Sequence, residues 1–555
     1  MNRKKGYIGI SYTGCHDSNV TYFTDKVEFA ASEERFSRIK KDGRPPKLTI
    51  EYLLSKYKIS LDDVDIVSPV LPIEETKKLW RQEGVSNIYE LVKDKINYST
   101  EYIRKLTNSP IYVSHQDAHA ASAYFTCGFN EKSLILVIDA GNYSDPYSTS
   151  IYEGNKGKLI LLKQSTDNSI AQSYLLITAM LGFKPMKHEG KVTGLAPYGS
   201  YNKYAINDLQ KILDDKEFVF RATKWDNFGS KNVAPELVIT NEIEKTNWFI
   251  SKYSKEDIAY AIQHITENKV LSLLKEYDTN EYSNICMAGG LFANVTLNRK
   301  IAELGFKKIF IHPAMGDDGL SLGSILYAKM RKEGYLQPFK IDNVYWGSEY
   351  LSVDIPELAE KNNLYCYKSN SMEQEIAEYL KNEKTVALYS GRMEYGPRAL
   401  GNRSVLCHAN NKDINDWLNK KLKRTEFMPF APVVRDERVK KLFKNTKPGY
   451  YTGNFMTTTF LCTEEMKKIA PGAVHIDGTA RPQIVEEKAN PFYYTILQKY
   501  DEITNEKSVL INTSFNMHEE PIVNTPQDAV KSFIASQLDV LVLNDFIITW
   551  KQISY

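Results

Sequence analysis

The chain of 555 residues is longer than one ordinary hydrophobic core supports, so we expect more than one domain. Hydrophobic residues make up 42% and charged residues 25%, which excludes a disordered or fibrous protein. The 71 Lys and Arg residues nearly balance the 69 Asp and Glu residues, so net charge does not attract a polyanion. No apolar stretch of about 18 residues and no secretory leader is present, so we expect a cytoplasmic protein without a membrane partner.

Short β-forming runs alternate with helical stretches along the chain, which is typical of an α/β fold. Strands are predicted at Tyr7–Ser11, Leu134–Asp139, Ile309–His312, Thr385–Tyr389 and Val540–Leu543. Helices are predicted at Ala118–Thr126, Ile258–Glu276 and Glu373–Lys381. The charged stretch Lys77–Arg104 is interpreted as a helical insertion. Turn-forming, aromatic-rich sequence follows a helix within Lys332–Tyr350, which predicts two domains, 1–345 and 346–555.

Two histidines, His115 and His119, are spaced i, i+4 in an alanine-rich segment that favours helix. This spacing puts both imidazoles on one helix face, where they can share a divalent cation if oxygen ligands complete the site. Asp139 follows an apolar strand, and Asp317 lies in the glycine-rich segment HPAMGDDGLSLG. Together they form a candidate His2Asp2 set; the alternative is a pair of ordinary surface or core histidines, and Asp318 competes with Asp317.

The second half carries four segments that combine polar or basic side chains with turns. They are GRMEYGPRALGNRSVL (391–406), KRTEFMPFAPVV (423–434), HIDGTARPQIV (475–485) and INTSFNMHEEPIV (511–523). Arginines held among glycines and prolines can present guanidinium groups to a phosphate or a carboxylate. A lone arginine is more often part of a surface ion pair, but four such segments favour a binding pocket for a small anion.

The motifs GISYTGCHDSNV, EERFSR, HQDAHAASAY, KVTGLAPYG, AGGLFAN and GDDGLSLG occur in this order in the first half. This half resembles the N-terminal part of the O-carbamoyltransferases that modify nodulation oligosaccharides and several antibiotics. It is also similar to the tRNA threonylcarbamoyl-transfer enzymes of the actin-like and sugar-kinase-like ATPase superfamily, which implies a duplicated α/β domain.

The resemblance implies roles for particular residues of the first half. His115, His119, Asp139 and Asp317 are expected to ligate a divalent metal, Fe2+ before Mn2+ or Mg2+, and nucleotide contacts are expected at Gly289, Gly290, Asn294 and Lys191. His16 is the expected general base or positioning group for an acceptor hydroxyl, oriented by Asp17. In a generic chain this His-Asp pair reads as a loop cap.

GPRALGNRS, PFAP, DGTARPQ and NTSFN resemble the C-terminal domain of the same carbamoyltransferases, which is similar to threonylcarbamoyl-AMP synthases and implies a second, twisted-sheet α/β domain. Arg398, Lys423, Arg481 and Ser514 are expected to hold carbamoyl phosphate and the ATP phosphates, with Arg403 and Asn512 as further candidates. One departure is Glu519, which stands where the family has a glycine.

The resemblance implies an ATP-dependent O-carbamoyltransferase. It is expected to form carbamoyl-AMP from carbamoyl phosphate and Mg2+-ATP in the second domain and to transfer the carbamoyl group to a hydroxyl in the first. Candidate acceptors are a sugar, a natural product or a hydroxymethylated base, so nucleic acid enters only as the carrier of a modified base. A homo-oligomer is compatible with the sequence. The alternatives are a tRNA threonylcarbamoyl-type enzyme, an actin-like ATPase, and a binding protein with vestigial sites.

Overall fold

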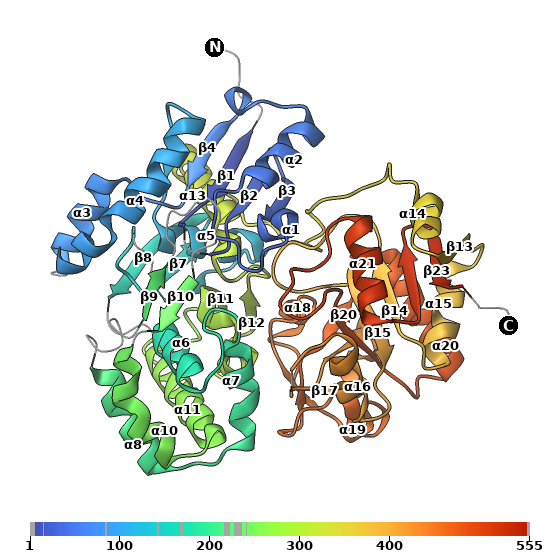
Figure 1. The fold of residues 1–555 in the computed structure, drawn as a ribbon. Coiled ribbons are helices and arrows are strands. Elements are labelled where there is room, and N and C mark those ends of the chain that lie inside the picture. The colour runs from blue at the N-terminus through green and yellow to red at the C-terminus, as the bar shows by residue number, and fades with distance from the viewer. Residues whose placement is uncertain are drawn as a thin grey trace. The chain divides into compact units, whose positions relative to one another are not determined.

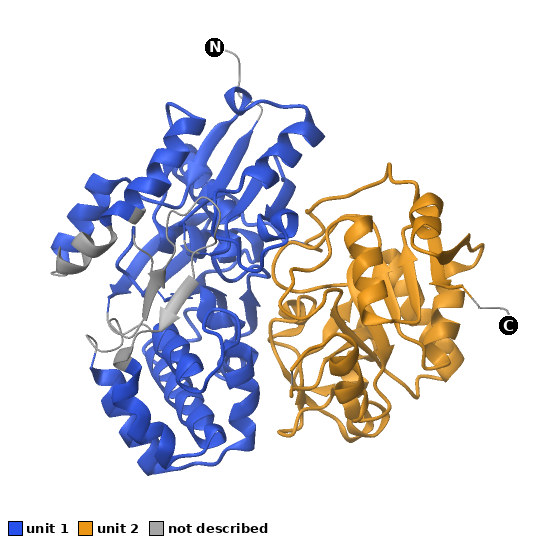
Figure 2. Ribbon diagram, in the orientation of Figure 1, with its two compact units in different colours: residues 1–341 blue, residues 342–555 orange. Residues whose placement is uncertain are grey.

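The computed structural model describes residues 6–14, 16–83, 86–140, 144–166, 170–215, 223–226, 236–239, 241–425 and 427–551. The chain divides into two compact units, Met1–Ile341 and Asp342–Tyr555 (Figure 2). The expected join near residue 345 lies just inside the second of them. Each unit combines helices with β-sheets, so the predicted α/β fold class is confirmed.

Unit 1 contains two five-stranded sheets with the same topology (Figure 1). In the order β3-β2-β1-β4-β5, the first three strands form an antiparallel meander, and β4 and β5 continue parallel to β1. The second sheet repeats this plan as β8-β7-β6-β11-β12, again with an antiparallel meander and two parallel strands. The duplicated arrangement expected for this half is therefore present in the strand order itself.

The bounds of these strands are β1 (Tyr7–Ser11), β2 (Asn19–Phe23), β3 (Val27–Ser32), β4 (Asp65–Ser68), β5 (Ile111–Tyr112), β6 (Ser133–Ile138), β7 (Thr149–Asn155), β8 (Lys158–Ser165), β11 (Asn284–Ala288) and β12 (Lys308–Ile311). A separate hairpin pairs β9 (Thr223–Asp226) with β10 (Glu236–Ile239). The central strands β6 and β11 are buried along their whole length, which explains why their sequences are almost continuously apolar.

The helix that ends each repeat packs on the sheet of the other repeat. Helix α5 (His115–Thr126) follows the first sheet but packs on β6, β7 and β11, whereas α13 (Leu320–Glu333) follows the second sheet but packs on β1, β2 and β4. The two helices also contact each other closely, because a Cβ atom on Gly323 would lie 1.9 Å from the Ala118 carbonyl oxygen. A glycine is therefore required where α13 crosses α5.

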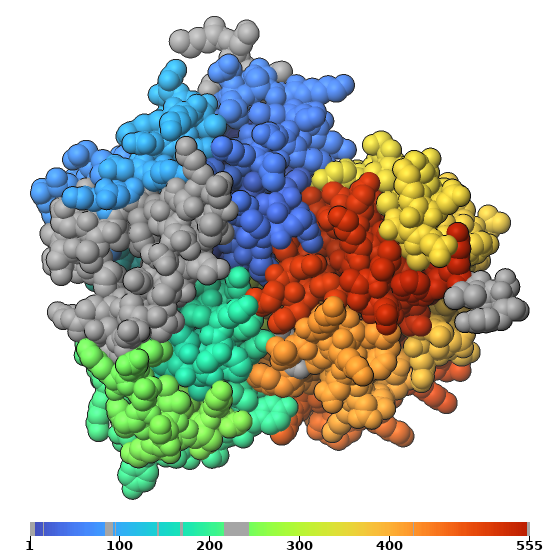
Figure 3. Space-filling view, viewed as in Figure 1, coloured from blue at the N-terminus to red at the C-terminus, as the bar shows by residue number. Residues whose placement is uncertain are grey.

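The remaining helices of unit 1 are α1 (Glu34–Ser37), α2 (Lys47–Tyr57), α3 (Ile73–Gln82), α4 (Ser86–Leu106), α6 (Ile170–Met180), α7 (Glu189–Leu195), α8 (Lys203–Asp214), α10 (Asn247–Lys252), α11 (Lys255–Leu274) and α12 (Val295–Ala302). The predicted insertion at 77–104 falls on α3 and α4. Helices α6, α7, α8, α10 and α11 share one apolar cluster, and atoms of this helical layer form the green surface in Figure 3.

Unit 2 is built on an eight-stranded mixed sheet in the order β13-β23-β22-β14-β15-β21-β16-β20. Alternate residues of its strands enter two different apolar clusters, since Ala387 and Tyr389 belong to one and Val386 and Leu388 to the other. Side chains alternate between the faces of a strand, so both faces of this sheet are covered. Helices α15 and α20 cover one face, and α14, α16 and α21 contribute to the other.

The strands of unit 2 are β13 (Leu364–Lys368), β14 (Val386–Tyr389), β15 (Arg403–His408), β16 (Ala431–Arg435), β20 (Gln483–Val485), β21 (Leu510–Ser514), β22 (Val540–Leu543) and β23 (Phe546–Trp550), with a small sheet of β17 (Phe443–Lys444), β18 (Phe460–Cys462) and β19 (Thr479–Ala480). Its helices are α14 (Ile355–Lys361), α15 (Met372–Lys381), α16 (Ile414–Lys421), α17 (Val439–Leu442), α18 (Tyr450–Gly453), α19 (Glu464–Ile469), α20 (Pro491–Thr504) and α21 (Pro526–Ser536). Across the described parts of both units, no helix has the length and apolar character that spanning a membrane requires.

Candidate functional site

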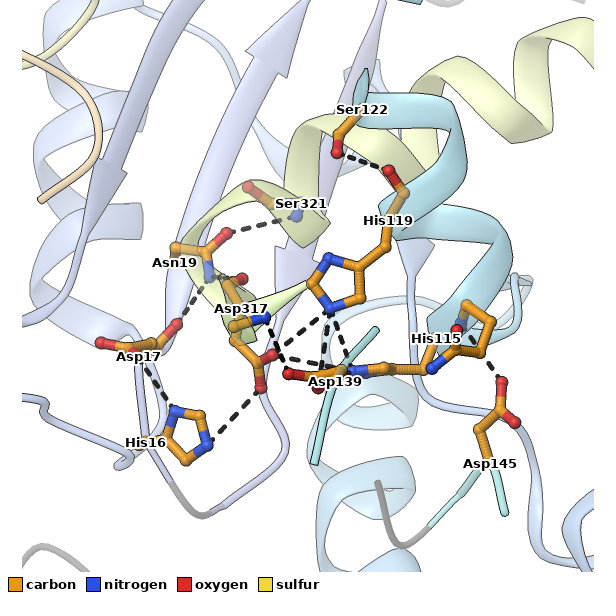
Figure 4. A network of polar contacts seen from close by, with 12 residues as sticks. His16, Asp17, Asn19, His115, His119, Ser122, Asp139, Asp145, Asp317 and Ser321 are labelled. Carbon is orange, nitrogen blue, oxygen red and sulfur yellow. Dashed lines mark hydrogen bonds and ion pairs between the residues drawn. The ribbon is translucent and has the colours of Figure 1, made fainter. Parts of the chain in front are cut away.

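The duplicated topology of unit 1 brings equivalent ends of the two repeats together. The loop after β1 carries His16 and Asp17, and the equivalent position after β6 carries Asp139. Helix α5 begins at His115, and the short turn that leads into the equivalent helix α13 begins at Asp317. Four segments far apart in sequence thus meet where the exchanged helices start (Figure 4).

His115, His119, Asp139 and Asp317 form one buried group whose ligand atoms all lie within 4.8 Å of one another. The Nε2 atoms of the two histidines are 3.2 Å apart. His115 Nε2 lies 3.1 Å from Asp139 Oδ2, and His119 Nε2 lies 3.8 Å from it. Both Nε2 atoms lie 3.6 Å from Asp317 Oδ1. The structure therefore brings together the four residues that the sequence singled out.

These distances suit a bound divalent cation. Ligand atoms about 2.1 Å from a shared metal are roughly 3.0 to 3.4 Å apart in octahedral or tetrahedral sites, close to the spacings seen here. Two imidazoles with two carboxylates favour a first-row transition metal such as Fe2+ or Mn2+ over Mg2+, which prefers oxygen ligands alone. The residues present thus fit the metal that the resemblance implies.

The electrostatics of the group favour a cation in the same place. Burial by itself lowers the pKa of His119, but hydrogen bonds and charge from Asp139 and Asp317 outweigh burial and raise that pKa to about 9. Two buried carboxylates without a compensating positive charge are costly, so the site holds either a proton on an imidazole or a metal. A metal that binds here therefore displaces that proton.

His16 lies beside this group, with its Nε2 atom 3.8 Å from Asp317 Oδ2. Its Nδ1 atom lies 3.0 Å from Asp17 Oδ2, and Lys41 Nζ donates to the same carboxylate oxygen at 2.7 Å. Burial lowers the pKa of His16, but the charges of Asp317 and Asp17 outweigh it and raise the pKa above its ordinary value. Burial also opposes ionisation of Asp17, yet Lys41 holds the pKa of Asp17 well below its usual range.

Lys41 was not singled out from the sequence. It lies just after the motif EERFSR, and its backbone N–H donates to the Glu34 carboxylate at 2.8 Å. The neighbouring Glu33 accepts from the N–H groups of Leu48 and Thr49 and so caps helix α2. Glu34 therefore holds the backbone of Lys41 beside the Lys41–Asp17 ion pair, whereas Glu33 holds the start of helix α2.

The glycine-rich turn AGGLFAN contacts the metal group through a backbone hydrogen bond to Asp139. The Gly290 N–H donates to Asp139 Oδ1 at 3.0 Å, which leaves Asp139 Oδ2 facing the histidines. Gly289 has φ 104°, and a Cβ atom there would lie 2.2 Å from the Ile138 carbonyl oxygen. Asn294 caps helix α12 and bonds Gln263. Lys191 is buried on helix α7. The nucleotide contacts expected at these four residues stay predictions.

Gly289 and Gly305 allow the steric contact to be separated from backbone strain. Both have φ near 104°, but a Cβ atom on Gly305 would meet only Thr279 Oγ1 at 3.8 Å. Gly305→Ala should cost about 1 to 2 kcal/mol from its left-handed backbone. Gly289→Ala should cost about 1 to 3 kcal/mol more and lower metal content, because the clash displaces Ile138 and Asp139. Thermal unfolding and metal analysis measure both; equal effects of the two changes would contradict the packing assigned to Gly289.

In unit 2 the four polar segments meet at one end of the large sheet. Asn512 on β21 donates through Nδ2 to Gln483 Oε1 at 2.6 Å and to the Ala399 carbonyl oxygen at 3.2 Å. Gln483 in turn donates to the Leu400 carbonyl oxygen at 2.7 Å, and Ala431 on β16 pairs with Asn512. The side chain of Asn512 therefore fixes the loop that carries Arg398.

Arg398 carries a guanidinium group that lacks an anionic partner. Within the part of the chain that the structure describes, no hydrogen bond or ion pair is formed by this side chain, and its Nε atom is buried. Burial lowers the pKa of Arg398 to about 10, so the group remains charged at neutral pH. The side chain is half-buried, so its charge is only partly shielded from solvent, and a bound anion would compensate the part that is buried.

Arg403 has a different environment. Its side chain is completely buried, donates to the carbonyl oxygens of Ser390, Gly391 and Asn402, and lies 3.6 Å above the Tyr389 ring. Glu394, which the sequence did not single out, accepts the N–H groups of three residues of the same loop with one carboxylate oxygen. Both side chains thus shape the loop, and a phosphate contact by Arg403 stays a prediction.

Two basic residues, Lys423 and Arg424, follow helix α16, and only Arg424 contacts strand β21 among the described residues. Lys423 is exposed, with a left-handed backbone, while the neighbouring Arg424 donates to Thr513 Oγ1 at 2.6 Å and to Ser514 Oγ at 3.1 Å. Arg424 was missed because adjacent basic residues look alike in sequence. Arg481 is half-buried and lies within DGTARPQ, between β19 and β20.

Glu519, at the position where the resemblance implies a glycine, has a left-handed backbone conformation. Its φ is 63°, in the left-handed region that favours glycine. A glutamate in this conformation carries about 1 to 2 kcal/mol of local backbone strain.

Comparison with known proteins agrees with the motif order. Residues 75–326 match the family described as "Carbamoyltransferase N-terminus", and residues 377–550 match "Carbamoyltransferase C-terminus". The chain belongs to the carbamoyltransferase family. This carbamoyltransferase is 33% identical to the uncharacterized protein MJ1051 of Methanocaldococcus jannaschii over 95% of this chain and 96% of that one. It is 30% identical to nodulation protein NolO of Bradyrhizobium diazoefficiens over 79% of this chain and 78% of that one.

Among solved structures, the carbamoyltransferase is similar to component A of (R)-2-hydroxyglutaryl-CoA dehydratase from Acidaminococcus fermentans. The two share 13% identity, with a TM-score of 0.37, over 59% of this chain and 98% of that one. The matched families thus identify the chain as a member of a transferase family, with the N-terminal match in unit 1 and the C-terminal match in unit 2.

Proposed function

We propose that the protein is an ATP-dependent O-carbamoyltransferase that works through carbamoyl-AMP. The observation that carries this proposal is the buried His2Asp2 group beside His16 in a chain of the carbamoyltransferase family. The unpartnered guanidinium of Arg398, in the other unit, supports a separate anion-binding site. Two chemically different sites suit a reaction with an activation step and a transfer step.

In the activation step, water hydrolyses carbamoyl phosphate to phosphate and carbamate, and a carbamate oxygen then attacks the α-phosphate of Mg2+-ATP and expels pyrophosphate. The product is carbamoyl-AMP. Arg398 neutralises phosphate charge in this step, together with Lys423, Arg481 and Ser514. Asn512 keeps the Arg398 loop in place through its bond to the Ala399 carbonyl oxygen.

In the transfer step, an acceptor hydroxyl attacks the carbamoyl carbon, AMP leaves, and the hydroxyl proton must be removed. A metal held by His115, His119, Asp139 and Asp317 would stabilise negative charge on the phosphate oxygens of the adenylate. His16 accepts the proton at Nε2 or positions the hydroxyl. Asp17 orients the imidazole through its contact with Nδ1, and Lys41 in turn holds the Asp17 carboxylate. Gly289, Gly290, Asn294 and Lys191 line the proposed nucleotide side of this site.

Pyrophosphate release tests the activation step. With ATP, Mg2+ and protein present, release should depend on added carbamoyl phosphate, and AMP should appear only when a hydroxyl acceptor is also present. Mass spectrometry of acceptors should show the gain of one carbamoyl group. Release of phosphate and ADP from ATP, without pyrophosphate and independent of carbamoyl phosphate, would instead favour an actin-like ATPase.

His16→Asn separates the two steps. The change should leave carbamoyl-AMP formation intact and slow transfer by about 10² to 10⁴-fold, because proton removal from the acceptor is lost. Single-turnover transfer from preformed carbamoyl-AMP measures this directly. An unchanged transfer rate would remove His16 from the mechanism.

A further inference from the structure

Asp145 is a buried carboxylate that the proposed mechanism does not use. Its side chain is 1% exposed. Oδ2 accepts the N–H of Gln116 at 3.2 Å, and Oδ1 accepts the N–H of Tyr147 at 3.2 Å. Gln116 returns a bond from its Nε2 atom to the Tyr147 carbonyl oxygen at 2.9 Å. Reciprocal bonds therefore fasten the segment around Asp145 to the first turn of helix α5.

This fastening joins two of the metal-binding elements. Helix α5 begins with His115, one residue before Gln116, so Asp145 holds the turn from which the His115 imidazole projects (Figure 4). The segment that contains Asp145 is tied to the other element, because the Asp139 N–H donates to the Ser148 carbonyl oxygen at 2.9 Å. Asp145 thus lies between the backbone that carries His115 and the backbone that carries Asp139.

A carboxylate suits this place for two physical reasons. It accepts two backbone N–H groups that are otherwise left without a partner in the interior. Its negative charge also lies at the N-terminal end of a helix, where the aligned peptide dipoles favour it. An asparagine has one acceptor oxygen and one donating NH2 group, so it can satisfy only one of the two N–H groups.

We propose that Asp145 is a positioning residue for the metal group: it clamps the backbone of His115 to the segment that begins at Asp139, without ligating the metal itself. This assignment rests on the proposed metal site of unit 1. Groups that orient metal ligands commonly change metal affinity by about 10 to 100-fold when they are replaced.

Co2+ titration of the metal-free, full-length protein tests the assignment. Asp145→Asn should weaken Co2+ binding by about tenfold while the positions of the Co2+ absorption bands stay unchanged, because the four ligands are intact. Gln116→Leu removes the reciprocal bond to Tyr147 and should weaken binding in the same direction by a smaller factor.

Glu33→Gln is the matched control. Glu33 is likewise a buried carboxylate of unit 1 that accepts backbone N–H groups at a helix start, and none of its hydrogen bonds reaches a metal-binding residue. Its replacement should lower the thermal stability and leave the Co2+ dissociation constant unchanged.

The outcomes are distinguishable. Wild-type affinity in folded Asp145→Asn overturns the assignment, and if that variant does not fold, wild-type affinity in Gln116→Leu overturns it. Equal weakening in Glu33→Gln also overturns it, because general loss of stability then explains the effect. If the wild-type protein binds no Co2+ at all, the metal site itself is wrong, and the assignment falls with it.

Discussion

Replacing His119 by alanine should abolish metal binding and slow carbamoyl transfer by about a thousandfold or more, while carbamoyl phosphate-dependent pyrophosphate release continues. The reason is geometric, since His119 Nε2 lies within 3.8 Å of the ligand atoms of Asp139, Asp317 and His115. Loss of one imidazole leaves two buried carboxylates with one imidazole. Metal stabilisation of developing charge is worth several kcal/mol, which corresponds to this loss of rate.

The measurement is metal content together with the two half-reactions on the same preparation. His264→Ala serves as the control, because His264 lies on α11 and bonds Asn268 rather than any member of the metal group. This variant should keep metal, pyrophosphate release and transfer. Equal loss of both half-reactions in His119→Ala would argue against two separate sites.

Arg398→Met should reduce pyrophosphate release by about 10² to 10³-fold and at the same time raise the melting temperature of the protein. The guanidinium group lacks an ion pair or hydrogen bond within the described residues, and burial lowers its pKa to about 10. Because this half-buried side chain holds its charge partly away from solvent, the charge costs some stability in the free protein and is compensated when an anion binds. Removal of one preorganised charge from such a site typically costs this much rate.

Arg435→Met gives the opposite result for a paired arginine. Arg435 donates to Asp501 at 2.8 Å, so its removal leaves a buried carboxylate with fewer partners. The melting temperature should fall, and folded protein should retain pyrophosphate release. A fall in melting temperature for Arg398→Met as well, or retained activity in it, would show that Arg398 is structural.

Several elements of the fold were predictable from local sequence alone. Strand Tyr7–Ser11 and strand Val540–Leu543 were predicted with the bounds observed, and helix α5 was predicted from the alanine-rich segment that begins at His115. These signals are local, because an apolar run or a helical repeat of side chains depends on neighbours within a few residues. The domain join near residue 345 rested on the same kind of local change in composition.

The pairing of strands was outside the reach of such patterns. The residues of β1 and β6 do not show that each is the first strand of an antiparallel meander with the same topology. They also do not show that α5 and α13 each pack on the sheet of the other repeat. The motif order suggested a duplicated domain only through resemblance to a family. Several strand neighbours are chosen by contacts between residues more than a hundred positions apart, as in the pairing of Ser133 with Asn284.

The candidate site divides in the same way. The sequence by itself determined that His115 and His119 share a helix face and that aspartates follow two apolar strands. Only the tertiary structure decided that Asp317 joins the metal group while the adjacent Asp318 does not. It also decided that Arg398 has no partner among the residues that the structure describes, whereas Arg403 donates to three carbonyl oxygens. It decided as well that Arg424 rather than Lys423 contacts Ser514. Residue type and spacing fix which groups are available, but the partner of each group depends on long-range packing, which no local pattern contains.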